Sequence, residues 1–323
     1  MKTIRIGVVL TAALLLVAAT PAAAPATAAA VSAVPAVDVL SYNVMLLPRS
    51  LYPNWGQMKR ADLIAAAPIL SGHDVVVLQE MFDNGASDRL KAGLAGRYPH
   101  QTPVLGRSRT GWDTTAGAYA DVTPEDGGVV VASRWPILER IQYVFADGCG
   151  ADRFSNKGFV YVRLTVSGAT VHVVGTHAQA DDTACPGGSG AATRARQFAE
   201  LDAFLDARAI PAHEQVIIAG DLNVDRHGPE WAAARASLGV AEPRYAGHPY
   251  SWDAQLNGLA DYNDDADTRQ QLDHVVHRDG HARPAGWTSE THPVTSPRWS
   301  VTSWFTTYTY DDYADHYPVV GRA

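Results

Sequence analysis

Short runs of β-branched and other apolar residues recur along the chain, and several of them end directly on a polar side chain. Three such runs occupy residues 74–79, 170–176 and 215–219. Their length and composition are typical of buried strands. Glu80, His177 and Asp221 follow these runs, with Asn223 two residues after Asp221. Because open sheets hold their chemistry at strand ends, we expect these side chains to converge on one site.

The remaining pattern predicts further strands and several helices. Strands are expected at residues 37–44, 127–133, 158–166 and 271–277, with a final one around residue 319. Helices are expected at 57–70, 87–98, 193–208 and 229–238, with Pro68 as a break and Ser87 as an N-cap. Gly220 is expected to turn the backbone before Asp221. A hairpin turn at 167–169 makes part of the sheet antiparallel, so the order predicts a mixed α/β domain with packed sheets.

Composition narrows the class of protein. The chain has 323 residues, of which 46% are hydrophobic and 19% are charged, as in an ordinary globular protein. Since no low-complexity linker or repeat divides it, we expect residues 31–323 to form one domain, which would be the catalytic one. We also expect the protein to be a monomer. The net charge of -8 argues against nucleic acid as a partner, because affinity for nucleic acid comes largely from Lys and Arg.

The first 30 residues have the pattern of a secretory signal peptide. Lys2 and Arg5 precede an apolar core at 6–19, and Ala-x-Ala sites follow. The core is short for a membrane span, which is the alternative interpretation. We therefore expect residues 1–30 to be removed, at a point left open, and the protein to be secreted and extracellular.

The chain contains two cysteines, Cys149 and Cys185, both in Gly-rich, loop-like sequence. In an oxidising compartment two such cysteines favour one disulfide, and two free thiols are the alternative. The bridge would join loops on either side of the strand pair between them.

The residue types at the strand ends suit metal-assisted hydrolysis of a phosphodiester. Oxygen ligands such as Glu80, Asn43 and Asp221 suit Mg²⁺, and His177 and His316 suit acid–base work or phosphate contact. Each has a structural alternative: a helix start for Glu80, an Asx turn for Asp221, a hydrogen-bonded core residue for His177. Their joint occurrence on separate apolar runs favours the chemical interpretation.

The series of motifs resembles the endonuclease/exonuclease/phosphatase superfamily, and most closely its secreted bacterial sphingomyelinases C. The motifs are Ser41-Tyr42-Asn43, Leu78-Gln79-Glu80, Gly175-Thr176-His177, Gly220-Asp221-Leu222-Asn223, Leu272-Asp273-His274 and Asp315-His316. Asn156-Lys157-Gly158-Phe159 and the stretch from Trp299 to Val319 add to the resemblance. His274 departs from it, because the family usually has Tyr there.

The resemblance implies a four-layer α/β/β/α sandwich of two packed mixed sheets. It implies a central Mg²⁺, with Mn²⁺ or Co²⁺ as alternatives, on Glu80 with Asn43 close by. The implied catalytic set is His316 as general base, His177 at the phosphate and leaving group, Asp221 and Asn223 positioning phosphate and water, Asp273 orienting a histidine, and Asp315. A peripheral Mg²⁺ or Ca²⁺ site is implied at the Phe82 carbonyl, Asn84, Glu125 and Asp126, for which a solvated acidic loop is the alternative.

An aromatic stretch at residues 299–313 bears on the substrate. Trp304 and Phe305 are adjacent, so in a strand they cannot both face the core. The resemblance places a membrane-contacting hairpin here, which favours a sphingomyelin-containing membrane as the substrate surface. Alternatives are a phospholipase C for glycerophospholipids or ethanolamine head groups, a secreted metal-dependent nuclease, and a membrane-binding module with no activity.

Overall fold

The computed structural model describes Thr3, residues 34–264 and residues 266–323. Residues 34–323 form one compact unit. The predicted signal peptide at residues 1–30 lies, apart from Thr3, outside the described residues. No helix among the described residues combines the length and the apolar character that crossing a bilayer requires.

Two mixed sheets form the centre of this unit. The first has the strand order β10 (Arg244–Gly247), β14 (Thr288–Thr291), β17 (Val319–Arg322), β1 (Val39–Asn43), β2 (Val75–Gln79), β5 (Val130–Ser133) and β3 (His100–Gln101). The second has the order β13 (Asp273–His277), β9 (Gln215–Asp221), β8 (Ala169–His177), β7 (Gly158–Val166), β6 (Ile137–Val144) and β4 (Thr114–Gly117). We call them sheet A and sheet B. Parallel pairs β1–β2 and β8–β9 lie beside antiparallel neighbours, so both sheets are mixed.

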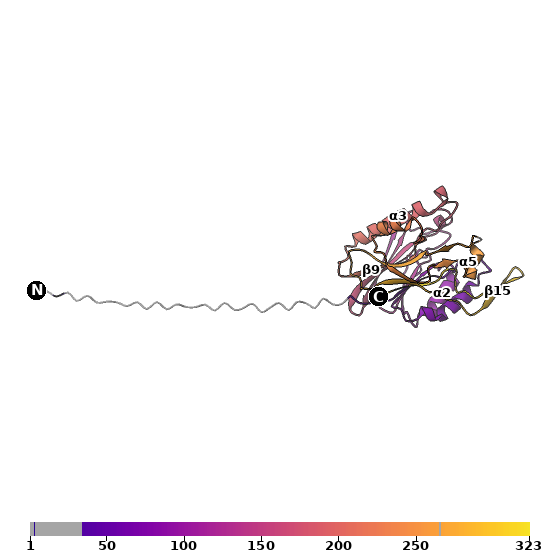
Figure 1. Cartoon of the computed structure of the whole chain (residues 1–323), viewed down its shortest axis with the longest axis horizontal. Coiled ribbons are helices and arrows are strands. Elements are labelled where there is room, and N and C mark those ends of the chain that lie inside the picture. The colour runs from indigo at the N-terminus through magenta and orange to yellow at the C-terminus, as the bar shows by residue number, and fades with distance from the viewer. Residues whose placement is uncertain (1–2, 4–33, 265) are drawn as a thin grey trace. The chain divides into compact units, whose positions relative to one another are not determined.

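Helices cover the outer face of each sheet, as Figure 1 shows. These are α1 (Gln57–Ala66) and α2 (Asn84–Leu94) on sheet A, and α3 (Ala191–Ala207) and α4 (Trp231–Leu238) on sheet B. Between the sheets, a cluster rich in valine includes Val77 of sheet A and Val173 of sheet B. These apolar contacts hold the sheets face to face, and the arrangement is the predicted α/β/β/α sandwich.

Smaller elements fill the connections. They are α5 (Gly258–Asn263), the strand pair β11 (Trp252–Asp253) and β12 (Arg269–Gln270), the hairpin β15 (Trp299–Ser303) and β16 (Thr306–Tyr310), and the 3-10 turns Pro68–Leu70, Asp152–Phe154 and Pro186–Gly188. The Cys149–Cys185 disulfide forms, and it ties the loop after β6 to the loop after β8.

Several predicted bounds are corrected. The helix expected at 57–70 ends at Ala66, because Pro68 opens a separate 3-10 turn. The helix expected from residue 87 begins at Asn84, and its N-cap is Asp83, which accepts a hydrogen bond from the Ala86 N–H at 2.9 Å. Gly220 makes no turn. It lies within β9, where a Cβ would collide with the carbonyl oxygen of Thr176.

Candidate active site

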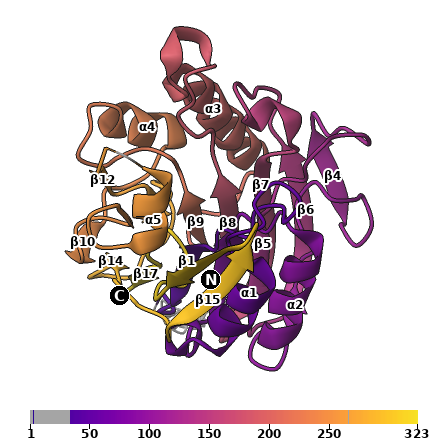
Figure 2. The same ribbon diagram turned by 90° about the vertical axis from the view of Figure 1, so that its right-hand side faces the viewer.

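The predicted strand-end side chains do converge, and they come from both sheets. Sheet A supplies Asn43 at the end of β1 and Glu80 just after β2. Sheet B supplies His177 at the end of β8, Asp221 at the end of β9 and Asp273 at the start of β13. Figure 2 shows β1 beside β9. All five residues are found where the two sheets present their ends together.

Asn43 links the two sheets within the site. Its side-chain amide nitrogen donates to Glu80 Oε1 at 3.0 Å and to Asp221 Oδ2 at 3.1 Å. Its side-chain oxygen Oδ1 accepts a hydrogen bond from the Met45 N–H at 3.1 Å. One amide therefore holds a carboxylate of each sheet at a fixed separation.

His316 lies between two carboxylates of sheet B. Its Nδ1 is 2.7 Å from Asp273 Oδ2, and its Nε2 is 3.8 Å from Asp221 Oδ2. Burial lowers the pKa of His316, but Asp273 and Asp221 outweigh burial and raise it well above the ordinary value. The two carboxylates thus stabilise the imidazolium that His316 forms when it takes up a proton as a general base.

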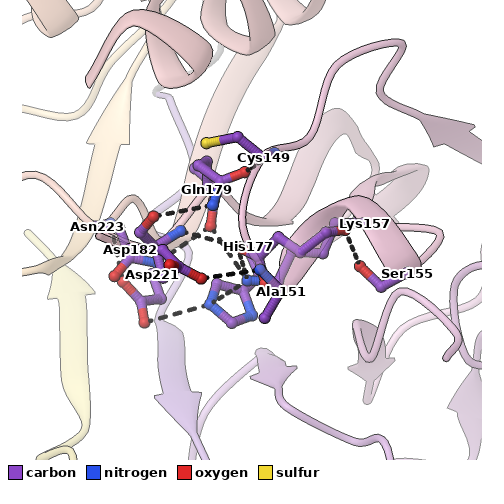
Figure 3. A network of polar contacts seen from close by, with 12 residues as sticks. Cys149, Ala151, Ser155, Lys157, His177, Gln179, Asp182, Asp221 and Asn223 are labelled. Carbon is purple, nitrogen blue, oxygen red and sulfur yellow. Dashed lines mark hydrogen bonds and ion pairs between the residues drawn. The ribbon is translucent and has the colours of Figure 1, made fainter. Parts of the chain in front are cut away.

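His177 has the opposite electrostatic environment. Burial lowers its pKa well below the ordinary value, and the neighbouring Lys157 and His316 lower it further. His177 Nε2 lies 3.3 Å from Lys157 Nζ and 3.7 Å from Asp221 Oδ2. Figure 3 shows this group of side chains from close by. Because an ammonium group can only donate, Nε2 of neutral His177 accepts and Nδ1 carries the proton. Nδ1 is buried and has no partner among the described residues.

The carboxylate of Glu80 fits a divalent cation. Its Oε2 is buried and has no hydrogen-bond partner among the described residues, while Oε1 accepts from Asn43. Glu80 also has a positive φ of 57°, which a non-glycine residue rarely adopts. Burial raises the pKa of Glu80, which the Asn43 hydrogen bond partly offsets. A hard cation bound by this oxygen would satisfy it, so the donor chemistry agrees with the predicted central metal.

A second grouping, Asp221, Asp273 and His316, also has potential ligand atoms within 4.8 Å of one another. We interpret this set as a base with its partner carboxylates, because His316 Nδ1 already donates to Asp273. The sequence singled out all three residues. The structure shows that Asp273 contacts Nδ1 of His316 and that Asp221 lies nearer Nε2.

Asn223 and Asp315 sit at the edge of this group. Asn223 has a φ of 52°, and its side-chain amide donates to the Ala178 carbonyl at 3.1 Å. The Oδ2 atom of Asp315 accepts a hydrogen bond from Asn263 of α5 at 3.4 Å. Burial raises the pKa of Asp315 to about 6. Asp315 therefore connects the His316 segment to α5.

The loops of the predicted peripheral metal site lie side by side. The Met81 N–H donates to the Gly128 carbonyl, and the Phe82 ring packs against Gly128. Asp126 forms an ion pair with Arg107 at 3.0 Å, while burial raises the pKa of Glu125 to about 7 and that of Asp126 to about 6. Arg107 thus competes with a cation for Asp126, and Asn84 lies at the start of α2 nearby.

Three residues near the site were not singled out for it from the sequence. Lys157 contacts His177 as described and pairs with Asp152 at 2.8 Å. Arg60 is fully buried in α1 and donates to the Val44 and Tyr313 carbonyls. Trp252 lies edge-on to His316, with ring centres 5.2 Å apart. For Arg60, the sequence signal was a charged residue among the apolar positions of a predicted helix. For Trp252, the sequence offered no signal.

The tip of the β15–β16 hairpin is formed by Trp304 and Phe305. Both have positive φ, 48° and 67°, and pairing of Ser303 with Thr306 leaves them as the two turn residues. Trp304 is 86% exposed and Phe305 is fully exposed. Two large apolar side chains therefore project from the protein at a turn that normally favours Asn-Gly.

Residues 40–316 match the model of the Endonuclease/Exonuclease/phosphatase family. The chain belongs to this family. Within it, the similarity is to bacterial sphingomyelinases C. A sphingomyelinase C of Bacillus cereus is 47% identical over 290 residues, which cover 88% of this chain and 87% of the relative.

Solved structures agree with this relationship. The crystal structure of sphingomyelinase C from Streptomyces griseocarneus is 56% identical, with a TM-score of 0.88 over 90% of this chain and 99% of that one. A mutant beta toxin from Staphylococcus aureus, solved with bound magnesium ions, is 43% identical, with a TM-score of 0.88 over 90% of this chain and 100% of that one.

Proposed function

We propose that this protein is a metal-dependent phosphodiesterase of the phospholipase C type that hydrolyses sphingomyelin to ceramide and phosphocholine. The observation that carries the proposal is the meeting of the His316–Asp273 pair, at one end of the sandwich, with a buried Glu80 oxygen that no described residue hydrogen-bonds. The extensive similarity to sphingomyelinases C supports sphingomyelin as the substrate.

In the proposed reaction, His316 takes a proton from water through Nε2, the water oxygen bonds to phosphorus, and the bond from phosphorus to the ceramide oxygen breaks. The released oxygen then takes a proton from solvent, and His316 returns its proton to solvent. Asp273 accepts the Nδ1–H bond and stabilises the imidazolium that forms. His177, kept neutral by burial, donates through Nδ1 to a phosphate oxygen or to the leaving oxygen. Lys157 adds positive charge behind His177, and Asp221 and Asn223 position water and phosphate.

A divalent cation, for which we propose Mg²⁺, would be held by Glu80 with Asn43 close by, and would supply charge neutralisation at the phosphate and the departing oxygen. Mn²⁺ or Co²⁺ would suit the same oxygen donors. We propose Phe82, Asn84, Glu125 and Asp126 as a peripheral site for Mg²⁺ or Ca²⁺, supported by the contact between their two loops.

We also propose that residues 1–30 are a secretory signal peptide, that residues 31–323 act as one monomeric catalytic domain outside the cell, and that Trp304 and Phe305 enter the membrane surface. The disulfide is consistent with an oxidising compartment.

Head-group release from defined liposomes tests the function. Sphingomyelin, phosphatidylcholine and an ethanolamine lipid are compared with Mg²⁺ and with EDTA. Release of phosphocholine from sphingomyelin that EDTA abolishes supports the proposal. Release from glycerophospholipids instead would establish the alternative phospholipase C, and plasmid nicking without lipid hydrolysis would establish a nuclease.

A further inference from the structure

Exposed apolar side chains are concentrated at one end of the sandwich. Among the described residues, ten large apolar side chains are exposed, and all but Val34 and Leu138 lie in the segments that connect the strands at the end that holds the site. A soluble surface normally scatters such residues singly, and their concentration on one face marks an interaction surface. Val122 and Phe154 belong to this group and lie outside the hairpin.

Strand directions place Val122 and Phe154 at the site end of sheet B. β4 ends at Gly117 and β6 ends at Val144, and the two are parallel. β7 begins at Gly158, and Phe159 pairs with Thr176, the residue before His177. The loops at 118–129 and 145–157 therefore emerge from the same end of sheet B as His177.

The hairpin emerges from the same end of sheet A. Thr291 at the end of β14 pairs with Val319 at the start of β17, and Val319 pairs with Ser41 near the end of β1. The β15–β16 hairpin lies between these two strands in the chain. The Trp304–Phe305 turn is thus connected to strands of sheet A and the Val122–Phe154 pair follows strands of sheet B, in both cases at the end that holds the site.

Val122 and Phe154 form one preorganised feature. Val122 is 94% exposed and Phe154 is 49% exposed. The hydroxyl of Thr123, next to Val122, donates to the Phe154 carbonyl at 2.7 Å. Val122 and Phe154 line one hollow of about 330 Å³. Asn156 fixes the first loop by two hydrogen bonds to the backbone of Ala120. Because the loops are already held, docking them would require little ordering.

The charges around this pair are balanced. Asp121, next to Val122, is paired with Arg109 at 2.9 Å. The Arg153 guanidinium lies 4.5 Å from the centre of the Phe154 ring. Apolar tips beside one ion pair and one cation held over a ring suit a zwitterionic lipid surface, while the net charge of -8 opposes an anionic one.

We propose that Val122 and Phe154 form a second membrane-contact point, which docks the sheet B side of the site on a zwitterionic lipid surface. The inference rests on the proposed action at a membrane. Contact through the hairpin alone would let the protein pivot about one point. A second contact from the other sheet would hold the site against the lipid head groups.

Vesicle binding tests this proposal without turnover. The parent protein carries His316→Ala, and binding to phosphatidylcholine vesicles with Mg²⁺ is measured by co-sedimentation. We expect Val122→Ser with Phe154→Ser to weaken binding about tenfold, because two apolar contacts are lost. Leu138→Ser is the matched control, since Leu138 is 50% exposed at the opposite end of sheet B. Binding of the double variant within twofold of its parent, or an equal loss in the control, would overturn the proposal.

A labelled position gives a second measurement that does not depend on weakened binding. Both native cysteines are in the disulfide, so Val122→Cys introduces a single thiol for an environment-sensitive dye. We expect a blue shift of its emission on vesicles and none from a dye at Leu138→Cys. An unshifted dye at position 122 on bound protein would refute lipid contact there. Neither readout requires sphingomyelin hydrolysis, so failure here is distinct from failure of the proposed reaction.

Discussion

The Nδ1 atom of His316 lies 2.7 Å from Oδ2 of Asp273, although the residues are 43 positions apart and belong to different segments of the sandwich. This contact fixes which histidine nitrogen faces the site. Because Nδ1 is hydrogen-bonded to Asp273 Oδ2, Nε2 is the atom available for proton transfer. Asp273 thus lies on the Nδ1 side of the His316 ring, and Asp221 lies on the Nε2 side.

Asp273→Asn tests the pair. An amide at this position no longer stabilises the imidazolium, so we expect kcat to fall by about a hundredfold or more. The measurement is phosphocholine release from sphingomyelin, with vesicle binding as the structural control. If kcat stays within a few-fold while His316→Ala is inactive, His316 does not depend on Asp273.

Glu80→Gln tests the cation. In the wild-type protein, a cation bound only by the folded state raises stability by RT ln(1 + [L]/Kd), about 2.7 kcal/mol at a hundredfold excess over Kd. We expect added Mg²⁺ to raise the denaturation midpoint of the wild type and to have a much smaller effect on Glu80→Gln. Asp202→Asn, a change on the outer helix α3, is the control. An equal midpoint shift in Glu80→Gln would place the stabilising cation elsewhere.

Replacing Trp304 and Phe305 by Asn and Gly separates hairpin folding from membrane contact. Both residues have positive φ, which costs roughly 1 kcal/mol each for non-glycine residues. We expect the double variant to protect β15 and β16 more strongly from amide hydrogen exchange, because Asn-Gly suits this turn. The same variant should hydrolyse liposomes more slowly and a soluble phosphodiester at the wild-type rate. Unchanged liposome hydrolysis would remove the turn from the membrane contact.

Stability should fall in mild acid because of His277. This histidine is buried against Trp287, neither ring nitrogen has a partner among the described residues, and burial lowers its pKa to about 3. As pH falls below about 6.5, the unfolded chain takes up a proton that the folded protein refuses, so stability declines down to about pH 3. The expected contribution of His277 to the loss between pH 7 and pH 5 is about 2 kcal/mol.

Comparison with His277→Phe isolates this contribution. The variant keeps a ring against Trp287 and cannot titrate, so its free energy of unfolding should change less between pH 7 and pH 5. Chemical denaturation at the two pH values provides the measurement. Identical pH dependence in both proteins would show that His277 has an ordinary pKa in the fold.

Removing the disulfide should destabilise the protein without dismantling the site. The bridge spans 36 positions, for which loop-closure entropy gives about 4 kcal/mol, an upper value for measured losses. We expect Cys149→Ala with Cys185→Ala to lose roughly 2–4 kcal/mol in guanidinium titration and to keep most of its kcat. A large fall in kcat at unchanged stability would instead tie the bridged loops to catalysis.

The sequence predicted the fold class well where one residue pattern determines one element. The runs ending at Gln79, His177 and Asp221 are buried strands as expected. β6 was missed because it is partly exposed and has a bulge between Ile137 and Glu139, so its apolar residues do not alternate cleanly. The edge strands β4 and β10 were missed for a related reason, since neither contains a buried residue.

The membership of the site was predicted better than its internal contacts. Strand ends indicated Glu80 and Asp221, but no pattern shows that Asn43 would donate to both. Lys157 reaches His177 across neighbouring antiparallel strands, and Trp252 meets His316 through an isolated bridge. Such contacts depend on tertiary register, which a sequence pattern does not encode locally.

The Asn43 link has a consequence for how this protein gains its activity. Glu80 belongs to one sheet and Asp221 to the other, so neither half of the sandwich holds a working set of groups. A partly folded chain with one sheet assembled would have normal secondary structure and no turnover. The hydrolytic rate during refolding therefore counts the molecules in which both halves have closed on each other, and it should lag behind the recovery of backbone circular dichroism.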